Sequence, residues 1–112
     1  MIWMEKEFHI IEIKDLPEDS VARLDFTWKI SRGKITDFAI NVSLLEGEKS
    51  RDVYRVDTKH GYLHEQKFWI SPKPLSVDMS NNAAFVKKKK ETFENYGRWI
   101  KLFKDARKRG EI

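Results

Sequence analysis

The chain contains no cysteine among its 112 residues. Disulfide bonds and thiolate metal sites are therefore excluded, and any metal ion would need histidine and carboxylate ligands. A chain without disulfides fits a reducing compartment, so we expect an intracellular, cytoplasmic protein. No motif indicates a cofactor.

Long apolar segments are also missing. The wholly apolar runs span only a few residues, and Glu5, Glu7 and Glu12 fall within the first dozen positions. A signal peptide or a membrane-spanning helix needs a continuous apolar segment of about 7 to 20 residues. We therefore expect neither a cleaved leader nor a membrane partner.

Charged residues are abundant and nearly balanced in sign. They make up 36% of the chain, with 22 Lys and Arg against 18 Asp and Glu. Such a composition is typical of an ion-pair-rich surface and is consistent with a thermophilic source. The net charge of +4 is unevenly placed, because residues 87–112 carry +6 and residues 1–86 carry −2. The basic character belongs to the C-terminal segment.

The first 70 residues carry the two-residue period of β-strands. Two clean alternations flank Arg32-Gly33, which predicts a hairpin with its apolar residues on one face; they are Ala22, Leu24, Phe26, Trp28 and Ile30, then Phe38, Ile40, Val42 and Leu44. Further strands are expected at about 2–14, 51–57 and 63–70. The phase of the first strand slips, which predicts a β-bulge near Ile10.

The last third of the chain changes to a helical period. Pro72 and Pro74 cannot continue a sheet, so residues 71–81 are expected to be a linker. From 82 to 109 apolar residues recur at three- and four-residue steps, which predicts one long amphipathic helix. Gly97 interrupts this pattern and indicates either a close helix-to-sheet crossing or a break into two helices.

Together these patterns predict a single α+β domain over residues 1–112. An antiparallel β-meander of about five strands should occupy residues 1–70, and the C-terminal helix should pack on one face of it. At 40% apolar and 12% aromatic content, the chain can build one core without covalent staples.

The candidate site is the segment from Asp57 to His64, between two apolar runs. One interpretation is turn chemistry alone, in which Asp57 and Thr58 bond to backbone amides and Gly61 takes a positive φ. A second is acid–base catalysis by Asp57, His60 and His64, with two imidazoles dividing the proton transfers of metal-independent RNA cleavage. A third is a metal site built from the same three side chains.

Several residues in or next to this segment have side chains of the kind that bind RNA. Arg55 and Lys59 carry charges that attract phosphates, and Tyr54 and Tyr62 offer rings on which bases could stack. We therefore expect Arg55, Lys59 and Tyr62 to contribute to nucleic-acid binding.

The stretch from Val53 to His64, with its D-T-x-H-G-x-x-H core, resembles a group of small prokaryotic proteins that includes TumE-like toxins of toxin–antitoxin pairs. Those proteins often carry a further histidine two residues on, where this chain has Gln66. The resemblance implies a toxin-like, RNA-directed role with Asp57, His60 and His64 as its site. It also implies an antitoxin-like protein partner.

The predicted helix carries a run of four lysines in its first half: Lys87, Lys88, Lys89 and Lys90. Four consecutive helical residues point around most of the circumference, so they favour a solvated face. The alternatives are nucleic-acid binding through dispersed phosphate contacts and binding of an acidic protein. A homodimer is a further possibility, since the helix's apolar stripe is wide. A non-enzymatic binding module using this helix is therefore the competing function.

Overall fold

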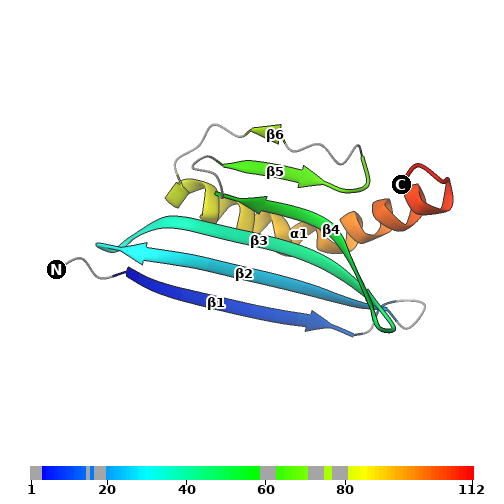
Figure 1. Ribbon diagram of the computed structural model, residues 1–112, viewed down its shortest axis with the longest axis horizontal. Coiled ribbons are helices and arrows are strands. Elements are labelled where there is room, and N and C mark those ends of the chain that lie inside the picture. The colour runs from blue at the N-terminus through cyan, green and yellow to red at the C-terminus, as the bar shows by residue number, and fades with distance from the viewer. Residues whose placement is uncertain (1–3, 15, 17–19, 59–62, 71–74, 77–80) are drawn as a thin grey trace.

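The computed structural model shows a six-stranded antiparallel sheet with one long helix against it (Figure 1). It describes the chain except for residues 1–3, 15, 17–19, 59–62, 71–74 and 77–80. The elements are β1 (Met4–Ile13), β2 (Val21–Ser31), β3 (Lys34–Glu46), β4 (Lys49–Asp57), β5 (His64–Lys67), β6 (Leu75–Ser76) and α1 (Asn81–Lys108). The predicted α+β fold with an antiparallel meander and a C-terminal helix is confirmed.

The strands follow each other through the sheet in chain order, β1 to β6. The sixth strand differs from the prediction, because Leu75 and Ser76 lie in the segment expected to be a linker and pair with β5. A two-residue strand is too short to show a period in the sequence. The helix begins at Asn81 and ends at Lys108, within one residue of the predicted limits at each end.

The β2–β3 hairpin forms as its alternation predicts. Arg32 and Gly33 make a two-residue turn in which both φ angles are positive, 53° and 74°. This is the turn geometry whose twist matches that of the paired strands. All the apolar positions predicted to face inward on β3 are buried, namely Phe38, Ile40, Val42 and Leu44.

The bulge predicted near Ile10 is wrong. β1 pairs with β2 in one unbroken register from Met4 opposite Ser31 to Ile13 opposite Ala22. The change of phase in the sequence instead arises because this strand carries apolar residues on both faces. Ile11 and Ile13 pack against the core, whereas Phe8 and Ile10 are exposed.

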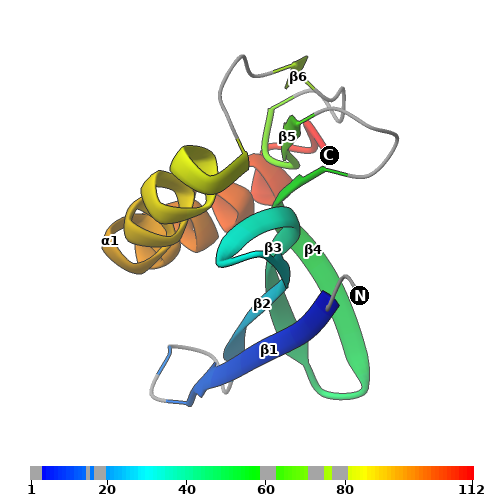
Figure 2. The same cartoon turned by 90° about the vertical axis from the view of Figure 1, so that its left-hand side faces the viewer.

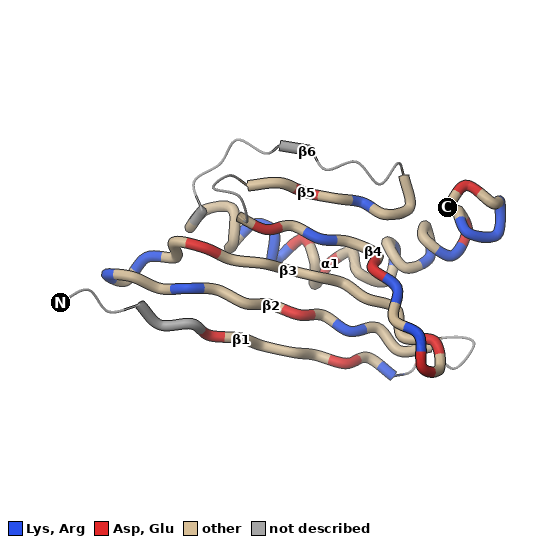
Figure 3. Tube along the Cα trace, viewed as in Figure 1, with Lys and Arg blue, Asp and Glu red and all other residues tan. Residues whose placement is uncertain are grey.

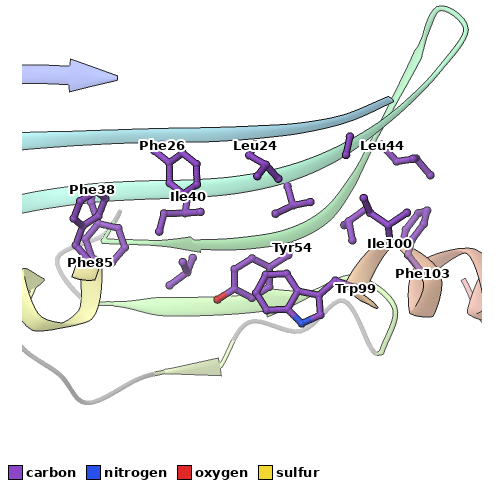
Figure 4. Close-up of a cluster of buried hydrophobic side chains, with 14 of the residues drawn as sticks. Leu24, Phe26, Phe38, Ile40, Leu44, Tyr54, Phe85, Trp99, Ile100 and Phe103 are labelled. Carbon is purple, nitrogen blue, oxygen red and sulfur yellow. The ribbon is translucent and has the colours of Figure 1, made fainter. Parts of the chain in front are cut away.

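The helix crosses one face of the sheet and packs mainly on β3 and β4 (Figure 2). Figure 4 shows the core between these layers, where Trp99 of α1 stacks on Tyr54 of β4 with ring centroids 4.0 Å apart. Phe85, one turn into the helix, packs against Phe38 and Trp28. Aromatic side chains bury large areas, so these contacts supply much of the stability of the interface.

Ion pairs hold both halves of the helix to the sheet. Near its start, Lys88 lies 2.9 Å from Glu65 of β5. Near its end, Arg107 makes a bidentate pair with Glu46, the last residue of β3, at 2.5 and 2.8 Å. Hydrogen bonding to Arg107 lowers the pKa of the Glu46 carboxyl. The described part of the chain contains no helix long and apolar enough to cross a membrane.

Gly97 fits neither interpretation of the sequence. The helix runs without a break from Asn81 to Lys108. Gly97 is exposed, and a Cβ added there would meet nothing within 4 Å. Its backbone is helical rather than left-handed, so this glycine makes no close crossing and relieves no strain.

We therefore expect Gly97→Ala to stabilise the protein by about 1 kcal/mol, because alanine loses less backbone entropy in a helix than glycine. Urea unfolding followed by circular dichroism measures the change. Gly33→Ala is the matched control: its φ of 74° is unfavourable for alanine, so the same substitution should destabilise there. A Gly97→Ala protein no more stable than the unmutated one would contradict this account of the helix.

Candidate functional site

The candidate site lies where β4 ends and β5 begins. Asp57 is the last residue of β4 and stands directly opposite His64, the first residue of β5. The Oδ1 atom of Asp57 is 3.0 Å from Nε2 of His64. Both side chains are largely buried, with 7% and 13% of their surface exposed. The strand pairing thus brings together two of the three residues predicted to form a catalytic site.

Arg55 completes this cluster on the same face of β4. Its Nε atom lies 3.4 Å from Oδ2 of Asp57, and 48% of its side chain is exposed. The two oxygens of the Asp57 carboxylate therefore face two different cations or donors: a guanidinium open to solvent and an imidazole that is mostly covered. The cluster can hold a negative ligand at Arg55 while the imidazole is kept in one orientation.

The cluster faces away from the helix. Tyr54 and Val56, which alternate with Arg55 and Asp57 along β4, are fully buried in the core beneath α1. Because successive side chains of a strand point to opposite faces, the Arg55–Asp57–His64 group lies on the other side of the sheet. The site therefore lies on the sheet face opposite the helix, where Asp57 and His64 are themselves largely buried.

Thr58 anchors the start of the loop that follows. Its backbone amide donates to the carbonyl of Phe38, and its hydroxyl oxygen accepts a hydrogen bond from the Phe38 amide, both at 3.0 Å. The hydroxyl also donates to Asp37 at 3.2 Å. The amides further along the loop, to which turn chemistry predicted that Thr58 would bond, lie outside the described residues; among the described residues Thr58 binds the neighbouring strand β3. This pairing fixes the backbone directly after Asp57.

The opposite face of the same hairpin carries a buried polar network. The hydroxyl of Tyr54 donates to Oε2 of Glu65 at 2.5 Å, and Nζ of Lys88 donates to the same oxygen at 2.9 Å. Lys88 also reaches Glu91, at 3.2 Å. One carboxylate oxygen thus joins β4, β5 and α1 in the interior.

The network shifts the pKa values of its members in the directions its contacts require. Burial raises the pKa of the Tyr54 hydroxyl, and the hydrogen bond to Glu65 raises it further. For Glu65, burial alone would raise the pKa, but hydrogen bonds from Tyr54 and Lys88 outweigh it and hold the pKa below its usual value. For Lys88, burial alone would lower the pKa, but Glu65 and Glu91 together raise it. The pair is therefore ionised near neutral pH.

Sequence reasoning missed this network and misplaced Tyr54. Tyr54 was expected to offer a stacking surface to RNA, yet it is fully buried against Trp99. The sequence does carry a signal for it. Glu65 is two residues after Leu63, the apolar first residue of the predicted strand, so both side chains point to the same face. An acid at an inward position of a strand needs a buried partner.

The four lysines of the helix have different surroundings. Lys87 and Lys90 are exposed, and Lys90 lies 3.8 Å from Glu94. Lys88 is buried with Glu65. Lys89 lies 5.6 to 5.9 Å from the ring centroids of Phe26, Trp28 and Phe85. Only the first and last of the four, Lys87 and Lys90, are therefore exposed to solvent, where phosphates could contact them, and Lys90 also lies near Glu94.

Three predicted site residues, Lys59, His60 and Tyr62, lie outside the described residues. Their predicted roles in catalysis and RNA binding stay predictions. Within the part of the chain that is described, no group of three His, Asp or Glu side chains is placed to hold a metal ion. The metal interpretation needs His60 as its third ligand and stays a prediction as well.

Comparison with known proteins adds one finding. A family model described as a domain of unknown function (DUF7718) matches residues 4–108, which include every strand and the helix. No curated protein and no solved structure matches the chain.

The buried ion pair between Lys88 and Glu65 provides a test of how the β4–β5 hairpin is held to the helix. Lys88→Met should destabilise the protein by about 3 to 5 kcal/mol, because it leaves the Glu65 carboxylate buried without its cation. Chemical unfolding at neutral pH measures the loss. Lys90→Met is the matched control on the same helix, and it should change stability by less than about 0.5 kcal/mol because its pair with Glu94 is exposed. Equal effects at the two positions would show that the Glu65 pair is not a buried interaction.

The lowered pKa of Glu65 also predicts a dependence on pH. A carboxyl whose folded-state pKa lies below its ordinary value of 4.5 stabilises the fold above that pH, and this contribution is lost as the pH falls through the folded-state pKa. Glu65→Gln should therefore be less stable than the unmutated protein at pH 7, and the difference should shrink in acid. Chemical unfolding of both proteins at pH 7 and at several acidic pH values measures this difference in stability. Glu94→Gln, at an exposed position, is the matched control and should change stability by less than about 0.5 kcal/mol.

Proposed function

The chain belongs to the DUF7718 family of domains of unknown function, and we propose that it is an RNA-directed protein, a metal-independent ribonuclease whose proton-transfer site includes Asp57 and His64. The observation that carries this proposal is the 3.0 Å contact between the Asp57 carboxylate and the His64 imidazole at the end of the β4–β5 hairpin. It is supported by the resemblance of Val53–His64 to the core of TumE-like toxins.

The chemistry needs one base and one acid. In RNA cleavage by transesterification, a base removes the proton of the 2′-hydroxyl, whose oxygen attacks the adjacent phosphorus. An acid gives a proton to the departing 5′-oxygen, and the products carry a 2′,3′-cyclic phosphate and a 5′-hydroxyl. Two imidazoles can divide these steps because both protonation states are populated near neutral pH. We assign them to His64 and His60, with Asp57 orienting the ring of His64.

Arg55 is the proposed phosphate contact. Its guanidinium is half exposed, stands beside Asp57 and carries donors that suit phosphate oxygens. A cation at this place would bring the scissile phosphate next to the imidazole and offset the charge that develops on the phosphorane oxygens. Lys59 and Tyr62 are proposed to extend this contact along the RNA.

A second candidate function is non-enzymatic binding of nucleic acid or an acidic protein by the helix. Basic residues are exposed along α1 and just beyond it, and Figure 3 shows them gathering toward the C-terminal end; they are Lys87, Lys90, Arg98, Lys101, Lys108 and Arg109. Charges spread in this way attract phosphates without reading sequence. An antitoxin-like protein with an acidic surface would suit the same face.

We expect His64→Ala to reduce RNA cleavage by roughly a hundredfold or more while RNA binding stays nearly unchanged, because proton transfer depends on one positioned ring. Cleavage is measured on end-labelled RNAs of varied sequence with a chelator present, and binding by a salt titration. His9→Ala is the matched control, since this exposed histidine of β1 lies far along the sheet from the site. It should leave cleavage intact.

The two candidate functions separate in the same assays. Neutralising Lys87 and Lys90 to glutamine should weaken RNA binding and flatten its salt dependence, with little change in the cleavage step at saturating RNA. If the unmutated protein cleaves none of the RNAs but binds them in a salt-dependent way, the ribonuclease proposal fails and the binding module is the better account. Cleavage that vanishes with chelator would overturn the metal-independent mechanism.

A further inference from the structure

β1 forms an open edge of the sheet. It pairs with β2 on one side over ten residues, and it is the first strand in the order of the sheet (Figure 1). On its other side no strand of the described chain pairs with it. A regular strand of this length presents a row of backbone donors and acceptors, and its natural ligand is another strand.

Residues 7–10 of β1 are also exposed on both faces of the sheet. Because α1 lies over β3 and β4, it leaves β1 outside its cover, and both Glu7 and His9 on the helix side are exposed. On the other face Phe8 and Ile10 expose 70% and 44% of their surface. Two large apolar side chains stand next to each other on one face of an open edge, which marks an interaction site rather than a solvated edge.

We propose that this edge binds a second copy of the chain, with the two β1 strands antiparallel and a two-fold axis through His9. In this register Phe8 of each copy stands directly opposite Ile10 of the other. The four apolar side chains then form one cluster across the axis, and cross-strand pairs of this kind stabilise a sheet. The two sheets join into one continuous sheet with both helices on the same side.

Charge complementarity supports the same register. Residue 6 of one copy falls opposite residue 12 of the other, so the positions of a lysine and a glutamate are paired twice across the axis. No two acids stand opposite each other. Shifting the strands by two residues in one direction sets Phe8 opposite Phe8 but position 6 opposite Ile10, and in the other direction sets Ile10 opposite Ile10 but Phe8 opposite Glu12. Of these three registers, only the one centred on His9 sets both Phe8 and Ile10 opposite an apolar residue.

These observations favour a second copy over an unrelated strand. An isologous interface needs a surface that is complementary to itself, and β1 carries its two exposed apolar residues symmetrically about His9. An unrelated strand would match this pattern only by carrying the same spacing of apolar and charged residues. The proposal is independent of the ribonuclease function, because three strands, β2 to β4, lie between β1 and β5 in the sheet.

The absence of cysteine from the chain allows a direct test of the register. Directly opposite Cα atoms of paired strands lie about 4.5 to 5.5 Å apart, within the range that a disulfide spans. His9→Cys should therefore give a disulfide-linked dimer under mild oxidation. Glu7→Cys is the matched control: its copies would be offset by four residues, roughly 13 Å along the strand, and should stay unlinked. Linkage through Cys at 8 or 7 instead of 9 would overturn the proposed register.

The association itself is measured on the unmutated full chain by sedimentation and light scattering over a range of concentrations. We expect a dimer, and we expect Phe8→Glu to weaken it by roughly tenfold or more, because each glutamate replaces an apolar contact opposite Ile10. Mixing Phe8→Glu with Ile10→Lys should restore association, since the new charges then face each other. Val86→Glu, at an apolar residue of α1 that is 63% exposed, should have no effect.

A chain that stays monomeric at every concentration would overturn the proposal. So would a dimer that Phe8→Glu leaves unchanged or that Val86→Glu breaks, because either would place the interface elsewhere. Circular dichroism of each variant shows that its fold is kept. RNA cleavage by a monomeric Phe8→Glu protein would leave the ribonuclease proposal standing, so the two proposals fail separately.

Discussion

The contact between Lys88 and Glu65 is the interaction on which the arrangement of the two layers depends. The helix and the sheet bury an apolar face between them, but apolar packing alone lets a helix slide or turn with little penalty. The shared carboxylate oxygen of Glu65 ties Lys88 of α1 to Tyr54 of β4 at one place in the core. Any other register of the helix would leave a charge buried without its partner. Arg107 and Glu46 set the far end of the helix in a similar way.

The β4–β5 hairpin divides its duties between two faces. Glu65 points into the core and secures the hairpin to the helix, whereas His64, the residue before it, lies on the opposite face beside Asp57. Adjacent residues of one strand thus serve stability on one side and the proposed chemistry on the other. A rigid support on the inner face is what a positioned imidazole requires, because proton transfer falls off steeply with misplacement. The proposed site and the buried pair therefore depend on the same hairpin.

The helix covers only part of the sheet, and the uncovered part differs in how far its side chains are buried. Over β3 and β4 the inward residues are buried, but at residues 7–10 of β1 the side chains on both faces are exposed, Phe8 and Ile10 among them. A sheet wider than the helix that covers it leaves an edge without partners. The exposed pair Phe8 and Ile10 belongs to that edge, and its symmetric spacing about His9 is what turns an unprotected strand into a surface suited to a second copy of itself.

Local periodicity sufficed for much of the fold. The alternation around Arg32-Gly33 predicts the hairpin and its inward residues, and the three- and four-residue steps after Asn82 predict the helix, because both periods are properties of the backbone of a single element. The same reasoning found Asp57 and His64 as candidates. It could not place Phe8 and Ile10 on an outer face, bury Lys88, or send Tyr54 under Trp99. Each of those depends on a contact between segments far apart in the chain: Lys88 is buried because Glu65, 23 residues earlier, is there to receive it. A charge in a sequence shows only that it needs water or a partner, and folding in three dimensions settles which of the two it has.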